Sequence, residues 1–167
     1  MTRNISQHIG RRGERVSDFY VLSPNDWVNI IPITSDGQVV MVEQYRHGVE
    51  AVTLEIPGGT VDDTDECPKD AAERELLEET GYTASEVIPL GFNYPNPAIQ
   101  SNVCHTYLAL DAKKIREPQF DSNEETVVRL VPMSEIEQLI IDGKINHALV
   151  IVAFHLLKIR QNTQQTV

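Results

Sequence analysis

The sequence predicts an α/β (or α+β) sandwich, and three observations lead to that fold class. Several short apolar runs are bounded by turn residues, one helix is framed by Pro68 and Gly81, and two helical segments close the chain. Strands mixed with flanking helices give a layered fold, because the apolar face of a sheet must be covered. The 167 residues, of which 41% are hydrophobic and 23% charged, suffice for one domain with a real core.

Seven β-rich runs are predicted strands, and they lie at 16–22, 27–34, 38–45, 52–56, 86–92, 103–110 and 126–131. The second and third runs are joined by Ser35-Asp36-Gly37, which predicts a hairpin between them. A helix is expected over 68–80, because proline suits its first position and glycine the residue past its end. Two more helices are expected at 134–142 and 146–160, the last from apolar residues at helical spacing.

The two ends of the chain differ from the middle in composition. Four arginines fall in residues 1–15, which we interpret as a basic N-terminal arm, and residues 161–167 read as a polar tail. Residues 16–160 are then a single domain. The N-terminus lacks the apolar stretch of a signal peptide, and two cysteines are too few for a secreted disulfide framework. A cytoplasmic protein with free thiols is therefore expected.

The charge balance excludes some function classes. The chain has 14 Lys and Arg against 25 Asp and Glu, for a net charge of −11. So acidic a chain is a poor candidate for general nucleic-acid binding, which needs cations to displace condensed counterions. No apolar run approaches the length of a membrane span. We expect neither nucleic acid nor membrane as a partner.

Carboxylates crowd the predicted helix at 68–80. Glu75, Glu78 and Glu79 share one face, and the last two lie at the negative end of the helix dipole. A solvated acidic face is the simplest interpretation, but it leaves this repulsion unexplained. A bound divalent cation removes the conflict, and Mg²⁺ takes oxygen ligands that it shares with substrate phosphates. Gly58-Gly59 would let backbone oxygens approach the same site closely.

The nine residues from Arg74 to Tyr82 match REUxEExGU, the core motif of the Nudix hydrolase family, where U is a bulky apolar residue. Glu66 stands eight residues before Arg74, as that motif requires. The motif also places a glycine six residues before this glutamate, but position 60 is Thr, and Gly59 lies seven before. The loop therefore carries one extra residue, or Asp65 takes the role of the upstream glutamate.

The resemblance implies a mixed β-sheet between helices and a loop–helix–loop around the motif. It implies Glu75, Glu78 and Glu79 as ligands of Mg²⁺, with Mn²⁺ as the alternative ion, and the Gly58 carbonyl as a further ligand. Arg74 resembles the residue that orients a ligand carboxylate by an ion pair. We count Glu79 and Arg74 among the catalytic residues for this reason.

Three features outside the motif resemble the branch of the family that hydrolyses ADP-ribose and other nucleoside diphosphate sugars. The strand end Glu43-Gln44-Tyr45-Arg46 is one, and its arginine is a good bidentate phosphate donor, although a surface ion pair is the alternative. The run Leu54–Gly59, which contains Glu55, is the second. Pro97, 16 residues after Gly81, is the third.

Two further site assignments are predicted. The general base in this branch comes from an acidic loop before the last strand, which points to Glu124 or Glu125, either of which could instead be a metal ligand or a solvated charge. Trp27, the only tryptophan, is a candidate for stacking on the nucleobase, with a core or interface role as the alternative. Homodimers are typical of this branch, and residues 16–22 could cross to the partner.

The expected activity is Mg²⁺-dependent hydrolysis of a nucleoside diphosphate sugar, of ADP-ribose or GDP-mannose type, to a nucleoside monophosphate and a sugar phosphate. Within the family, a nucleoside triphosphate or an RNA 5′-end is the alternative substrate, which Arg46, Pro97 and the negative charge disfavour. A module that binds a nucleotide sugar without turnover is the alternative in another class. It would not need the complete set of glutamates that this chain keeps.

Overall fold

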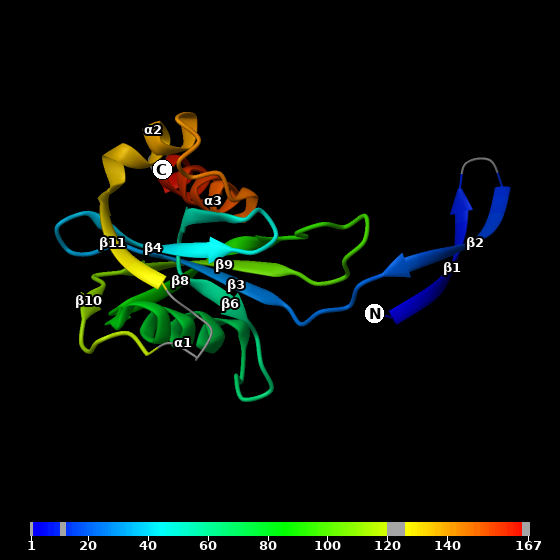
Figure 1. Ribbon diagram of the computed structural model, residues 1–167, viewed down its shortest axis with the longest axis horizontal. Coiled ribbons are helices and arrows are strands. Elements are labelled where there is room, and N and C mark those ends of the chain that lie inside the picture. The colour runs from blue at the N-terminus through cyan, green and yellow to red at the C-terminus, as the bar shows by residue number, and fades with distance from the viewer. Residues whose placement is uncertain (1, 11–12, 120–125, 165–167) are drawn as a thin grey trace.

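The computed structural model describes residues 2–10, 13–119 and 126–164. Figure 1 shows strands in the middle, α1 on one side of them and α2 and α3 on the other. The elements in chain order are β1 (Thr2–Gly10), β2 (Gly13–Val21), β3 (Trp27–Pro32), β4 (Gln38–Arg46), β5 (Ala51–Glu55), β6 (Gly58–Thr60), α1 (Pro68–Thr80), β7 (Tyr82–Thr83), β8 (Glu86–Asn93), β9 (Cys104–Leu110), β10 (Lys113–Lys114), β11 (Thr126–Pro132), the 3₁₀ turn η1 (Met133–Glu135), α2 (Ile136–Ile141) and α3 (Ala148–Gln164).

Two sheets form the middle layer. One has the strand order β6-β3-β9-β8 and is mixed, because β3 and β9 run parallel while the other neighbours are antiparallel. The other is antiparallel, with the order β11-β4-β5. Helices cover both sides, so the predicted α/β sandwich with a mixed sheet is confirmed.

Apolar side chains form one core on each side of the mixed sheet. Val28 and Ile30 of β3 pack with Leu76 and two alanines of α1. Ile31, on the opposite face of the same strand, packs with the residues of α3. Because β3 is buried on both faces, its sequence reads as a nearly continuous apolar run. This strand therefore fixes α1 and α3 relative to each other.

The predicted hairpin between 27–34 and 38–45 is wrong. A turn does join β3 to β4, with the Thr34 amide donating to the Gln38 carbonyl at 2.9 Å, but only an isolated Ile33–Val39 bridge follows it. The two strands then enter different sheets. The physical reason is that both edges of β3 already carry a partner, since β6 pairs with one edge and β9 with the other.

The N-terminal segment contains a two-stranded hairpin. β1 and β2 pair in register from Thr2–Val21 to Gly10–Gly13, and the resulting hairpin projects from the rest of the chain in Figure 1. At the other end, α3 continues to Gln164, four residues beyond the predicted 160, while residues 165–167 lie outside the described part. Of the described helices, none combines the length and hydrophobicity that crossing a bilayer requires.

Candidate active site

The strand β6 places two glycines where no larger residue fits. A Cβ atom at Gly58 would lie 2.3 Å from the backbone oxygen of Val28 in the paired strand β3. A Cβ atom at Gly59 would lie 2.2 Å from Oε1 of Glu75 in α1. The backbone of β6 therefore packs directly against the helix that carries the acidic motif, which only glycine permits.

The helix α1 begins and ends as the sequence predicts. Pro68 occupies its first turn, and Gly81 closes it in the left-handed conformation at φ 74°, with its amide donating to the Leu77 carbonyl. Its buried face consists of Ala71, Ala72, Leu76, Glu79 and Thr80. A glutamate on that face is unusual, because a buried carboxylate requires hydrogen bonds or a cation.

The three motif glutamates have different environments. Glu79 is only 6% exposed, and its Oε2 accepts a hydrogen bond from the amide of Gly58 at 3.2 Å. The side chain of Glu75 is 15% exposed and that of Glu78 is 43% exposed. Glu75 and Glu79 lie next to the glycines of β6, and Glu78 lies next to Arg74. The exposure of the carboxylates therefore increases from Glu79 through Glu75 to Glu78.

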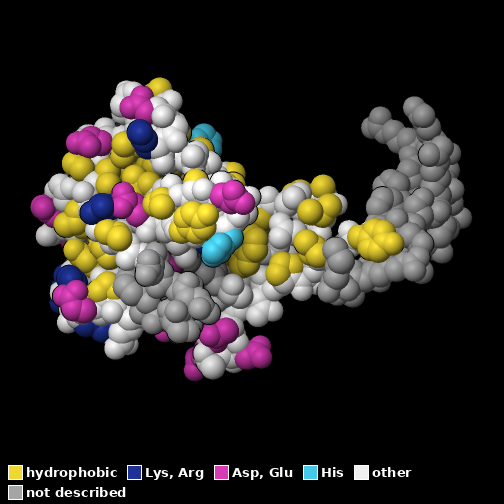
Figure 2. Space-filling view, in the orientation of Figure 1, with side chains coloured by type: hydrophobic (Ala, Val, Ile, Leu, Met, Phe, Trp, Pro, Cys, Tyr) yellow, Lys and Arg dark blue, Asp and Glu magenta, His cyan; other side chains and the backbone are white. Residues whose placement is uncertain are grey.

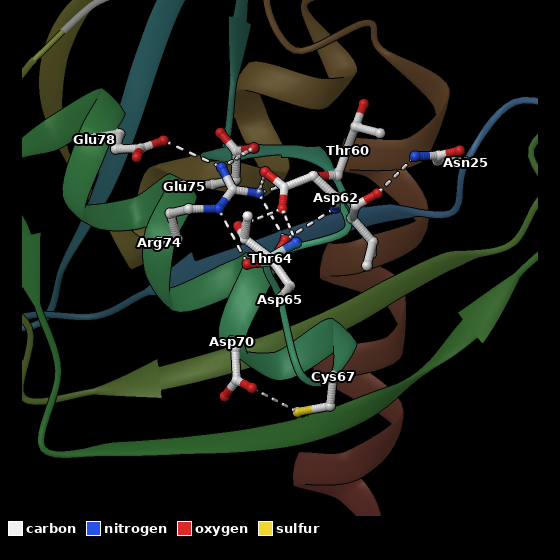
Figure 3. A network of polar contacts seen from close by, with 11 residues as sticks. Asn25, Thr60, Asp62, Thr64, Asp65, Cys67, Asp70, Arg74, Glu75 and Glu78 are labelled. Carbon is white, nitrogen blue, oxygen red and sulfur yellow. Dashed lines mark hydrogen bonds and ion pairs between the residues drawn. The ribbon is translucent and has the colours of Figure 1, made fainter.

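Arg74 organises the loop that leads into α1 (Figure 3). Its Nε and Nη2 donate to the two carboxylate oxygens of Asp65 at 3.1 and 2.9 Å, and Nη2 also donates to the carbonyl of Thr60 at 3.0 Å. Its Nη1 donates to Glu75 at 2.9 Å and to Glu78 at 3.1 Å. One guanidinium therefore joins β6, the loop and two motif glutamates.

Asp65, and not Glu66, is the acidic partner of Arg74. The side chain of Asp65 is only 5% exposed, whereas Glu66 is exposed to solvent. The hydrogen bonds from Arg74 lower the pKa of Asp65, and the same contact is the main cause that raises the pKa of Arg74 above its ordinary value. Of the two alternatives that the loop length leaves open, the geometry favours Asp65 in the upstream acidic role.

This pairing gives a testable contrast between neighbouring residues. We expect Asp65→Asn to break the bidentate pair and to misplace Arg74, which lowers turnover about tenfold or more because a shift of the supporting groups disturbs the reacting geometry. Glu66→Gln should leave activity and stability near wild type. Kinetics and thermal unfolding of both variants measure this. The opposite ranking would return the role to Glu66.

The donor set of α1 fits a hard divalent cation, because it consists of carboxylate oxygens with the backbone of a glycine turn beside them. Within the described residues, however, no three acidic, His or Cys side chains lie close enough together to hold an ion. Arg74 instead bridges Glu75 and Glu78. Further acidic side chains gather over the loop at 61–67, at the lower edge of Figure 2.

A cavity of about 370 Å³ lies beside β6. Trp27, Arg46, Glu55 and Gly58, all predicted site residues, line it together. Its size is that of a small-molecule site, roughly 300–1,000 Å³. A larger cavity of about 440 Å³ lies between α2 and α3, but none of the described candidate residues lines that one.

Several residues that line the smaller cavity were not among the predicted site residues. Asn29 of β3, His147 just before α3 and Leu149 in its first turn are among them. α3 brings its first turn back over the sheet, and no local pattern in the sequence signals that contact.

Arg46 and Glu55 form a partly buried ion pair in the cavity. Nε and Nη2 of Arg46 donate to the two oxygens of Glu55 at 2.9 and 2.8 Å, and the hydroxyl of Thr53 donates to Oε1. Burial alone would raise the pKa of Glu55, but the hydrogen bonds from Arg46 and Thr53 outweigh it and lower the pKa. The pair is therefore ionised at neutral pH and has no net charge.

The remaining predicted residues lie elsewhere. Pro97 is in an exposed turn between β8 and β9 and does not line the cavity. Glu124 and Glu125 lie outside the described residues. The flanks of their segment are described: the amide of Gln119 donates to the Glu78 carbonyl at 2.8 Å, the amides of 115 and 116 donate to the Gly81 carbonyl, and Thr126 pairs with Gln44.

Known proteins resemble this chain in sequence and in fold. Residues 24–154 match the model of the NUDIX domain. The chain is 29% identical over 138 residues to an ADP-ribose pyrophosphatase of Bacillus subtilis, covering 82% of this chain and 74% of that protein. It is 31% identical over 136 residues to a methanol dehydrogenase activator of Bacillus methanolicus, covering 80% and 72%. A crystal structure of an ADP compounds hydrolase superposes with a TM-score of 0.80 at 25% identity, covering 96% and 86%.

Proposed function

The chain belongs to the Nudix hydrolase family and is a pyrophosphohydrolase, and on that premise we propose that it hydrolyses a nucleoside diphosphate sugar of ADP-ribose or GDP-mannose type. The products are a nucleoside monophosphate and a sugar phosphate. One observation carries this proposal: the wall formed by β6 lines the cavity of Trp27, Arg46 and Glu55 and also contacts the carboxylates of Glu75 and Glu79. A substrate with a group beside its diphosphate can occupy both places.

The proposed roles follow from these positions. Glu75, Glu78, Glu79 and the Gly58 carbonyl would hold Mg²⁺, or Mn²⁺, and the bound ion would supply positive charge to the diphosphate oxygens. Arg74 orients Glu75 and Glu78 through the hydrogen bonds described above. Arg46 and Glu55 contact the substrate in the cavity, and Trp27 offers it an aromatic face. Pro97 is kept as a further substrate contact.

The proposed base is Glu124 or Glu125. A water molecule attacks one phosphorus atom in line, the bridging P–O bond breaks, and the proton of the water passes to this carboxylate. The flanks of its segment support the assignment, since one is bonded to Glu78 and the other is paired with Gln44, two residues before Arg46. We also propose that the protein acts in the cytoplasm as a homodimer, with the projecting β1–β2 hairpin as the segment that reaches the second copy.

A hydrolysis panel tests the proposal. Wild-type protein with excess Mg²⁺ is given ADP-ribose, GDP-mannose, UDP-glucose, a dinucleoside polyphosphate, dGTP and 5′-triphosphate RNA, and the products are separated by chromatography. We expect nucleoside monophosphate and sugar phosphate from the first two. Turnover of dGTP or RNA alone would overturn the substrate class, and binding of a nucleotide sugar without any turnover would favour a regulatory module.

A further inference from the structure

Thr53 is buried on β5 beside the ion pair of Arg46 and Glu55, but it does not line the cavity. Its side chain is on the same face of the strand as that of Glu55, two residues along. The hydroxyl lies 2.5 Å from Oε1 of Glu55, within the short range of hydrogen bonds to a carboxylate. The Gln44 carbonyl, at 3.2 Å, is the other acceptor in reach. Because the hydroxyl has one proton, the nearer and charged acceptor takes it.

The strand register explains why the ion pair needs this additional donor. Arg46 is opposite Ala51, and Glu55 is opposite Val42. The arginine side chain therefore reaches along β5, past Thr53, to the carboxylate, and not straight across to the residue that faces it. Both partners are long side chains with several rotatable bonds, so strand pairing alone does not fix the geometry of the pair.

Thr53 fixes the orientation of the carboxylate. Oε1 of Glu55 accepts from the Thr53 hydroxyl and from Nε of Arg46, while Oε2 accepts from Nη2. The terminal torsion of a glutamate is otherwise broad, and a bidentate pair with a guanidinium needs the carboxylate to be aligned with it. Threonine is β-branched, so the direction of its hydroxyl is restricted. A short and stiff side chain therefore sets the plane in which a long one is held.

We propose that Thr53 is a positioning residue, which holds the guanidinium of Arg46 at the wall of the cavity through the carboxylate of Glu55. This inference rests on the proposed function, in which Arg46 contacts the substrate. The side chain of Glu55 is 4% exposed and that of Arg46 is 41% exposed. The buried carboxylate is thus the anchor, and the guanidinium is the group that a ligand can reach. Thr53 acts only through these two residues.

The first test measures the position of Arg46 without any substrate. Thr53→Val removes the hydroxyl and keeps a β-branched side chain, so the strand should persist, whereas Thr53→Ser keeps the hydroxyl. NMR gives the rate at which the Nε proton of Arg46 exchanges with water, and the loss of its signal in Arg46→Ala identifies it. We expect exchange about tenfold faster in Thr53→Val, the scale of one lost hydrogen bond to a charged group, and near the wild-type rate in Thr53→Ser. A wild-type rate in Thr53→Val would overturn the inference.

The second test measures kinetics with the nucleotide sugar. We expect Thr53→Val to raise KM about tenfold and to change kcat less than about twofold, because a contact of equal strength in the ground state and the transition state affects KM alone. Thr53→Ser should recover the wild-type KM. If both Thr53 variants were equally impaired, Thr53 would act by packing and the inference would be wrong.

Thr106→Val is the matched control. Thr106 on β9 is 1% exposed, its hydroxyl has no hydrogen-bond partner among the described residues, and it does not line the cavity. This variant should keep the wild-type KM and the wild-type exchange rate of the Arg46 proton. A KM that rises equally in Thr106→Val and Thr53→Val would mean that any buried hydroxyl has this effect, which contradicts the role of Thr53.

The two proposals fail separately. If exchange of the Arg46 proton depends on the hydroxyl but no nucleotide sugar is hydrolysed, the proposed function is wrong and the positioning of Arg46 stands. If the panel shows hydrolysis but neither exchange nor KM responds to Thr53→Val, the role of Thr53 is wrong and the proposed function stands. Faster exchange with an unchanged KM would mean that Arg46 does not contact the substrate, which also overturns the inference.

Discussion

Glu79→Gln is expected to lower kcat at least about 100-fold, the scale of losing one major electrostatic contributor to an active site. Glu79 is the most buried of the three motif carboxylates and is held beside the Gly58 amide. The glutamine retains the size of the side chain and an acceptor for that amide, so the fold should persist. Its loss of charge weakens binding of a divalent cation. Steady-state kinetics over a range of Mg²⁺ concentrations measure the effect.

Glu73→Gln is the control for this variant. Glu73 lies on the same helix but is exposed, and its only role among the described contacts is an ion pair with Lys69 at 3.5 Å. Such a pair contributes about 0–1 kcal/mol, so this variant should keep wild-type activity and stability. If Glu79→Gln were as active as Glu73→Gln, the proposed metal site on α1 would be wrong.

Gly81→Ala is expected to destabilise the fold more than any other single methyl addition at a turn glycine with a positive φ. The left-handed backbone at φ 74° alone costs a residue with a Cβ about 1–2 kcal/mol. The added methyl group would also lie 2.0 Å from the backbone oxygen of Arg116, which cannot rotate away. Overpacking of this kind costs roughly 1–3 kcal/mol more. Urea unfolding followed by Trp27 fluorescence gives the free energy of unfolding.

Gly37→Ala separates the two costs. Gly37 has a similar φ of 80°, but no atom lies within 4 Å of its added Cβ. This variant should lose only the backbone contribution of about 1–2 kcal/mol. The difference between the two variants is then the cost of the contact with Arg116. Equal losses in the free energy of unfolding would mean that the 115–119 segment moves away from the added methyl group at no cost.

Local signals in the sequence were sufficient for α1 and insufficient for the strand pairing. Pro68 and Gly81 act through their own backbone geometry, so the bounds of α1 are predictable from the chain alone. β3 instead pairs with β9, placing Trp27 beside Cys104, and this choice depends on residues far along the chain. Two adjacent apolar runs with a turn between them predict a hairpin. That hairpin does not form, because both edges of β3 are already paired with other strands.

The same distinction holds for the site. The spacing of Glu75, Glu78 and Glu79 follows from helical periodicity, but counting residues could not decide between Asp65 and Glu66. That choice depends on how the loop brings one carboxylate to Arg74. His147 reaches the cavity only through the packing of α3 over the sheet, which involves no motif.

Hydrogen bonds join the 115–119 segment to the end of α1. The motif at 74–82 does not include this segment. The carbonyls of Glu78 and Gly81 accept from the amides of 115, 116 and 119, so we expect the last helical turn and this segment to open together as one cooperative unit. Amide hydrogen exchange should therefore give 115 and 119 the same opening free energy as the last turn of α1. The end of the acidic helix and the 115–119 segment are therefore expected to unfold locally in a single event.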